Sequence, residues 1–90
     1  MVKSTVMTAS GVVESTGVNL HSINVTQAGT TSVVTVYDNT TNSGRIVFQC
    51  DGDTIQSYPL GDYAGSGVYC NTGVYVEISG TAGTVVVNYV

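Results

Sequence analysis

Two cysteines, Cys50 and Cys70, carry the most reactive side chains in this chain of 90 residues. A disulfide between them would close a loop of about 20 residues and add roughly 3 kcal/mol to stability in the chain-entropy description. It would require Cα atoms within about 7 Å of each other, which the sequence does not show. Both residues also fit the pattern of small buried hydrophobic side chains. The sequence is therefore compatible with a disulfide between Cys50 and Cys70 and with two separate thiols.

His21 is the single histidine, and it bears on two kinds of chemistry. With Cys50 and Cys70 it would supply three zinc ligands, but no Cys-x-x-Cys or His-x₃-His spacing supports such a site. A Ser-His-Asp hydrolase is typically marked by a Gly-x-Ser-x-Gly turn, which is missing, and Ser22 would point away from His21 in a strand. We therefore expect a surface histidine and a protein that is not an enzyme, with no cofactor and no metal.

Asp51 and Asp53 flank Gly52 and form the closest pair of carboxylates in the sequence. They would hold a hard cation if Asp62 or backbone carbonyls joined them, although the full calcium-loop pattern is missing. Asp and Gly are also the residues that supply the backbone angles of tight turns. We interpret the segment as a turn and keep the cation site as the alternative.

Charged side chains are scarce: the chain has two basic and six acidic residues, 9% in all, against about 25% in an ordinary soluble domain. Lys3 and Arg45 are too few to form the basic patch that nucleic acid or an anionic membrane requires. Free monomers usually carry more charge than this. The composition therefore favours a protein covered by other subunits in an assembly, and the alternative is a soluble monomer with a surface rich in Thr and Ser.

The elements that position these side chains are expected to be short β-strands. Val and Thr, at 17 and 13 residues, make up a third of the chain, and both favour strands. Turn signals recur about every eight to twelve residues, which is typical of a sandwich or small barrel. We expect one domain over residues 1–90, an all-β antiparallel sandwich of the jelly-roll or immunoglobulin-like kind, with a barrel-like form as the alternative. The expected strands are Val2–Ala9, Val12–Ser15, Val18–Gln27, Ser32–Asp38, Arg45–Cys50, Thr54–Tyr58, Val68–Asn71, Val74–Ser79 and Thr84–Tyr89.

Alternation of apolar side chains predicts which face of a strand is buried, because successive residues point to opposite faces. The segment Val74–Ser79 alternates most clearly, with its even-numbered residues apolar. Ile46, Phe48 and Cys50 are likewise expected to share one face, opposite Val47. These faces are the first candidates for the core.

Two segments carry local signals. Within Val18–Gln27 the parity of the apolar positions changes, and a β-bulge near His21 would explain the change. Pro59 has no N–H to donate to a ladder, so we expect it at a strand end or at a sheet edge.

The last segment, Thr84–Tyr89, is apolar on both faces. Its odd-numbered residues point one way, and Val86 and Val90 point the other way. Such a strand is central in its sheet, or it buries its second face against a partner. Val86 and Val90 are therefore candidate contact residues.

Tyrosines surround the segment richest in glycine, Gly61–Gly67. Loops of this kind often carry binding residues, and tyrosine suits interfaces because it combines a large apolar ring with a hydroxyl. We expect Tyr58, Tyr63 and Tyr69, with Asp62, at a contact with another protein. Packing across strands is the alternative for each tyrosine.

Three pieces of the chain resemble a known family. They are Val36-Tyr37-Asp38-Asn39-Thr40 followed by Gly44, the stretch from Gly73 through Tyr75 and Gly80 to Ala82, and the closing Thr84–Tyr89. In this order and spacing they resemble small virion proteins of tailed bacteriophages, particularly phages of marine bacteria and cyanobacteria. The resemblance covers most of the chain, but the Gly61–Gly67 loop and both cysteines lie outside it. Its motifs are turns and strands rather than an active site.

The resemblance implies a β-sandwich that decorates and stabilises a phage capsid as a cement protein, binding the major capsid protein or other virion subunits without covalent chemistry. A homo-oligomer on the capsid surface, assembled in the host cytoplasm, is the corresponding expectation. The start of the sequence, Met1 to Thr5, has no apolar segment like that of a signal peptide, which agrees with assembly in the cytoplasm. The alternative function is a tail or fibre module that recognises a glycan on the host surface.

Overall fold

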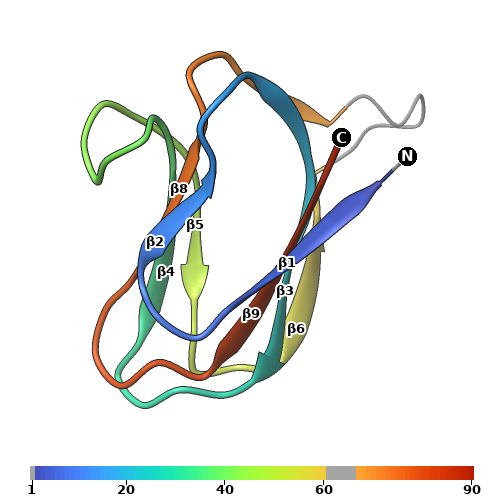
Figure 1. The fold of residues 1–90 in the computed structure, drawn as a ribbon. Coiled ribbons are helices and arrows are strands. Elements are labelled where there is room, and N and C mark those ends of the chain that lie inside the picture. The colour runs from blue at the N-terminus through green and yellow to red at the C-terminus, as the bar shows by residue number, and fades with distance from the viewer. Residues whose placement is uncertain (1, 61–66) are drawn as a thin grey trace.

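Nine β-strands, joined by turns and loops, make up the computed structural model, which describes residues 2–60 and 67–90 (Figure 1). Each strand overlaps one of the nine expected ranges, and the all-β prediction is confirmed. The strands are β1 (Lys3–Met7), β2 (Gly11–Glu14), β3 (Val18–Gln27), β4 (Val33–Asp38), β5 (Arg45–Asp51), β6 (Gln56–Pro59), β7 (Val68–Cys70), β8 (Val74–Ile78) and β9 (Thr84–Tyr89). Within the described residues, no helix is long and apolar enough to cross a membrane.

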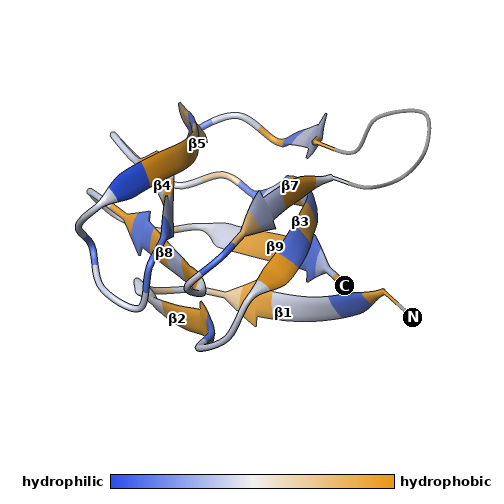
Figure 2. Cartoon of the chain, turned by 90° about the horizontal axis from the view of Figure 1, so that it is seen from above, coloured by the Kyte–Doolittle hydropathy of each residue, from blue (hydrophilic) through white to orange (hydrophobic). Residues whose placement is uncertain are grey.

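The strands form two antiparallel sheets that pack face to face (Figure 1). The first, called sheet A, has the order β1-β9-β3-β6, and β7 also pairs with β3. The second, called sheet B, has the order β2-β8-β4-β5. Viewed from above, β1 and β2 lie together along one side of the sandwich and β5 lies along the opposite side (Figure 2).

The strand pairs are nested along the chain, which distinguishes between the expected kinds of sandwich. Pairs form between β1 and β9, β2 and β8, β3 and β6, and β4 and β5, as if one long hairpin had been rolled into two layers. The short β7, which lies in the connection from β6 to β8, also pairs with β3 and is not part of this nested set of pairs. The arrangement is that of a jelly roll. Immunoglobulin-like order would place the first two strands side by side in one sheet, and here β1 and β2 lie in different sheets.

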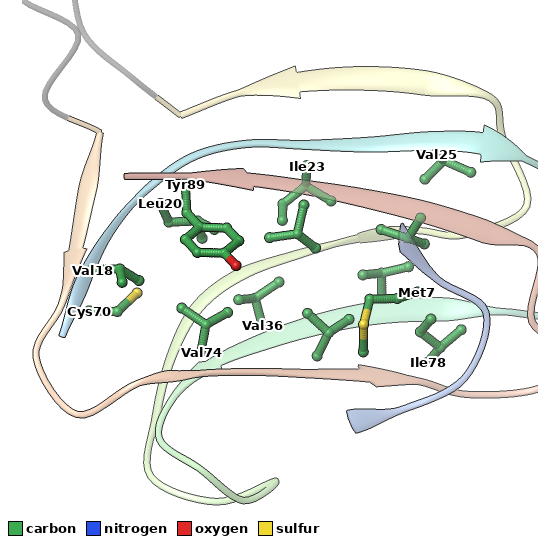
Figure 3. Close-up of a cluster of buried hydrophobic side chains, with 14 residues drawn as sticks. Met7, Val18, Leu20, Ile23, Val25, Val36, Cys70, Val74, Ile78 and Tyr89 are labelled. Carbon is green, nitrogen blue, oxygen red and sulfur yellow. The ribbon is translucent and has the colours of Figure 1, made fainter. Parts of the chain in front are cut away.

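Apolar side chains from both sheets fill the space between the layers (Figure 3). The alternation in β8 points Val74, Val76 and Ile78 inward, as the sequence predicts. The buried hydrophobic residues are Met7, Val18, Leu20, Ile23, Val25, Val34, Val36, Cys70, Val74, Val76, Ile78, Val85, Val87 and Tyr89. The core therefore consists mostly of β-branched side chains from both sheets, which suits the pleated faces of two packed sheets.

Two local predictions are confirmed in sheet A. The register of β3 against β9 shifts between Leu20 and Ser22, which leaves His21 as the extra residue of a β-bulge. Pro59 ends β6, an edge strand, where its missing N–H interrupts no ladder. The bulge keeps the apolar residues of β3 pointing inward on both sides of His21.

The C-terminal strand β9 is central in sheet A, between β1 and β3. Its residues Val85, Val87 and Tyr89 are buried, as their alternation predicts. Val86 points away from the core and is half-buried, and Val90 just beyond the strand is 43% exposed. The second apolar face of this strand therefore belongs to the outer surface of the sheet.

The expectation that Ile46 shares a face with Phe48 and Cys50 is wrong. The register of β5 against β4 shifts so that Phe48 pairs with Val36 and Ile46 pairs with Tyr37. A β-bulge at Val47 accounts for the shift, because one extra residue reverses the facing of the residues before it. Ile46 is therefore 53% exposed on the outside of sheet B.

Candidate interaction surface

The two cysteines are free thiols that lie in different sheets. Cys50 is half-buried on β5, opposite Val34, and Cys70 is fully buried on β7, opposite Val18. Figure 3 shows the Cys70 side chain beside Val18 in the core. Burial raises the pKa of each thiol to about 11, so both are protonated at neutral pH. Because the thiolate is the nucleophile and metal ligand, this position makes both cysteines packing residues.

The Asp51–Asp53 segment is a turn, as interpreted from the sequence. Asp51 Oδ1 accepts a hydrogen bond from the backbone N–H of Asp53 at 2.8 Å, and Asp53 Oδ1 accepts one from the backbone N–H of Ser32 at 2.7 Å. Both carboxylates therefore accept hydrogen bonds from backbone N–H groups, and they do not face each other across a binding site. Within residues 2–60 and 67–90, no group of three or more metal-ligating side chains occurs, and Asp62 lies outside these residues.

Asp38 is the carboxylate with the largest structural role, which the sequence did not reveal. Its oxygens accept hydrogen bonds from the backbone N–H groups of Asn71, Thr72 and Gly73, which form the turn between β7 and β8. Its side chain is also paired with Arg45 at 2.8 Å. Because β7 belongs to sheet A and β8 to sheet B, this one carboxylate fixes a crossing between the layers.

The pKa of Asp38 reflects these contacts. Burial alone would raise the pKa, but the hydrogen bonds from Arg45 and the three backbone N–H groups outweigh burial and lower it to about 2. Arg45 also donates a hydrogen bond to the backbone carbonyl of Tyr69 at 2.8 Å. One of the two strong cations is thus committed to holding the fold.

The outer face of sheet A, called the A face, carries no Asp, Glu, Lys or Arg side chain among the residues that the structure describes. Register and alternation place these residues on it: Ser4, Val6, Asn19, Ser22, Asn24, Ser57, Tyr69, Val86, Asn88 and Val90. Val6, Tyr69 and Val90 are 62%, 55% and 43% exposed. A partner that covers this face removes no charge from water, which is the costliest part of burying a surface.

The polar residues of the A face are hydrogen-bonded to one another. Asn88 Nδ2 donates to Ser22 Oγ at 2.8 Å, and Asn24 Nδ2 donates to the same oxygen at 3.2 Å. Ser4 Oγ donates to Asn88 Oδ1, which extends the network from β3 across β9 to β1. These groups keep partners when water is excluded, so the network lowers the cost of covering the face.

The structure separates the residues predicted to form a contact. Tyr69, Val86 and Val90 lie on the A face, where Asn19 pairs with Tyr69 and exchanges two backbone hydrogen bonds with Val90. Tyr58 instead points inward and packs its ring on Phe48, with centroids 5.3 Å apart, so it closes the sandwich between β6 and β5. For Tyr58, packing across strands, the alternative to a protein contact, is therefore what the structure shows.

Two other predicted contact residues, Asp62 and Tyr63, lie outside the described residues. The polar members of the A face were missed because Ser and Asn carry no strong pattern of their own. Their alternation with the buried residues of β3 and β9 is the signal that places them.

The outer face of sheet B, called the B face, has a different character. One row crosses all four strands in direct register: Val12, Tyr75, Tyr37 and Ile46. The two tyrosine rings meet edge-on, 6.5 Å apart.

A carboxylate neighbours the tyrosine row of the B face. Glu77 accepts hydrogen bonds from the hydroxyl of Tyr37 at 3.4 Å and from Asn42 Nδ2 at 3.1 Å. Burial, followed by the charge of Glu77 and this hydrogen bond, raises the pKa of Tyr37. The B face thus combines two half-buried tyrosine rings with hydrogen-bonding groups and a negative charge.

Comparisons with protein-family models, with curated proteins and with solved structures gave no match to this chain. The two faces are therefore interpreted from their own residues.

Proposed function

We propose that this chain is a structural protein of a tailed-phage particle, a capsid decoration protein that binds the major capsid protein through its A face. The observation that carries the proposal is that this face spans a whole sheet with uncharged side chains, several of them already hydrogen-bonded to one another. The central parts of protein interfaces are depleted in charged residues in the same way. The partner surface that fits it is likewise uncharged, and recognition rests on shape and hydrogen bonds.

The size of the face suits this role. A standard protein contact covers about 800 Å² on each partner, roughly a sixth of the 4604 Å² that this chain exposes. One face of a two-layered sandwich can supply such a contact and leave the other face exposed. Jelly rolls are also common in viral capsid and lectin domains, which is an analogy of fold and supports the proposal only in that sense.

The proposal is tested by adding the purified chain to particles that lack it. A lysine at Ser57, an exposed position on the A face, places a charge in the contact and is expected to abolish binding, because a buried unpaired charge is costly. The matched control is a lysine at Gln49, an exposed position on β5 of sheet B. Binding that survives S57K, or that is lost equally with Q49K, would contradict docking through the A face.

The B face favours the second candidate, a tail or fibre module that binds a host glycan. Tyr37 and Tyr75 offer ring surface, while Glu77 and Asn42 offer hydrogen-bonding groups for hydroxyls. A glycan array probed with the wild-type chain and with Y75A tests this. Binding that is lost in Y75A and kept in S57K would favour the glycan function over capsid decoration.

A further inference from the structure

Most edges of the two sheets carry features that block further strand pairing. A sheet edge exposes unpaired N–H and C=O groups, and short strands, prolines, bulges and charged side chains, lysine above all, are the usual protections. β2 has four residues and a register shift, β6 has four residues and ends at Pro59, and β7 has three residues. β5 is longer but carries the bulge at Val47, and its neighbour Phe48 packs on Tyr58.

The edge strand β1 differs from these strands. It has five residues and pairs with β9 from Lys3 to Met7 without any register shift, and its one charged side chain, Lys3, lies at the first residue of the strand rather than in its middle. Its other edge faces no strand in the described residues. On this strand Val6 is 62% exposed, the largest exposed fraction among the apolar side chains within the described strands.

The sequence of β1 is compatible with antiparallel pairing to a second copy of itself. When the two strands are centred on Thr5, each Lys3 lies opposite Met7 of the other copy, so the two lysines lie at opposite ends. Ser4 lies opposite Val6, and the two Thr5 side chains face each other, a favourable cross-strand pair. No like charges meet in this register.

The consequence for the A face follows from the symmetry. In this register the two copies are related by a two-fold axis that passes through Thr5 perpendicular to the sheet. Such an axis leaves both A faces on the same side of the joined sheet, so they form one continuous uncharged surface. The exposed side chain of Val6 is partly covered at the junction, and the unpaired backbone groups of β1 gain partners.

We propose that β1 is the docking strand through which two copies of this chain form a dimer with one continuous sheet. This dimer forms from the free chain and does not depend on capsid docking. Sedimentation equilibrium on the purified protein measures it directly. The expected result is a concentration-dependent mass of twice 9.3 kDa, and a mass of one chain up to the solubility limit would overturn the inference.

Charge variants test the register. S4E/V6E places like charges opposite each other at two symmetric positions and is expected to weaken the dimer about tenfold. S4K/V6E alters the same positions but places opposite charges across the junction, and it is expected to restore dimerisation. V12E on the edge strand β2 is the control and leaves the dimer unchanged. A dimer that responds equally to S4E/V6E and S4K/V6E, or that responds to V12E, would overturn pairing through β1.

Cross-linking gives a second readout that does not depend on affinity. Under mild oxidation, T5C is expected to form a disulfide between two copies, because residue 5 lies on the symmetry axis. S4C lies opposite Val6 and is expected not to cross-link. The native thiols, with pKa values of about 11, react little under the same conditions. Cross-linking of S4C but not T5C would contradict the register, whatever the result of the particle-binding experiment.

Discussion

Asp38 shows at the residue scale how one carboxylate holds two layers together. It satisfies three backbone N–H groups of the turn between β7 and β8 and also pairs with Arg45. The same residue belongs to the Val36–Thr40 motif that the sequence analysis singled out. Its chemistry there is structural, which agrees with a motif made of turns and strands.

Replacing Asp38 with asparagine is expected to lower the free energy of unfolding by about 1–3 kcal/mol at neutral pH, because N–H groups lose a charged acceptor. Chemical denaturation of D38N and wild type measures the difference. Glu14, a carboxylate at the end of β2, provides the control E14Q, which is expected to change stability little. Equal stability of D38N and wild type would contradict the role of this carboxylate.

The same residue predicts a pH dependence. The folded-state pKa of about 2 lies below the usual 3.8, so the ionised form is favoured in the folded chain. Its stabilisation is complete above pH 3.8 and is lost as the pH falls toward 2. The stability difference between wild type and D38N is therefore expected to shrink over this range. A difference that stays constant down to pH 2 would show that the charge of Asp38 does not contribute.

The cysteines give a prediction about reactivity. Because burial raises the pKa of both thiols to about 11, alkylation of the folded chain at mildly alkaline pH is expected to be slow. In denaturant, both thiols are expected to react fully. Intact mass without reductant should equal that of the fully reduced chain, and a mass two daltons lower would show the disulfide instead.

At the scale of elements, the sequence predicts most of the sandwich. Short β-branched runs and regular turn signals place all nine strands, and the parity change in β3 locates the bulge at His21. The bulge at Val47 escapes prediction because its neighbours Ile46 and Phe48 are both apolar, so the reversal of facing leaves no change of pattern. Which strands become neighbours also depends on packing between layers, which local patterns do not encode.

The candidate surface is predictable only in part, for a related reason. Tyr69, Val86 and Val90 are apolar or aromatic residues that stand out in the sequence, and they lie on the A face. The Ser and Asn residues beside them gain meaning only from register, because it brings Ser22 and Asn88 from distant segments together. Tyr58 has the same type as Tyr69 but the opposite orientation.

The two faces of β9 give a matched pair of substitutions. V87A removes two buried methyl groups from the core and is expected to cost about 2 kcal/mol of stability. V86A, on the A face, is expected to cost less than about 1 kcal/mol, because that side chain is only half-buried. Thermal unfolding of both variants checks the assignment of faces, and a larger loss in V86A would reverse it.

At the scale of the whole molecule, the charged side chains of residues 2–60 and 67–90 lie away from the A face. Asp38 and Arg45 hold the β7–β8 turn, Asp51 and Asp53 lie in the turn after β5, and Glu77 lies on the B face. Lys3 begins β1 of sheet A, but it pairs with the inward-pointing Tyr89 and so alternates with the A-face residue Ser4. Among the residues that the structure describes, the few Asp, Glu, Lys and Arg side chains therefore leave the A face free of them. Such a face suits a chain whose working state is attachment to other subunits.

Imaging of purified phage particles at a resolution that distinguishes the two sheets tests this account most directly. Capsid decoration through the A face predicts many copies of the chain on the capsid surface, each with its A face against a capsid subunit and its B face toward solvent. Absence of the chain from purified particles, or attachment that leaves the A face in solvent, would contradict it.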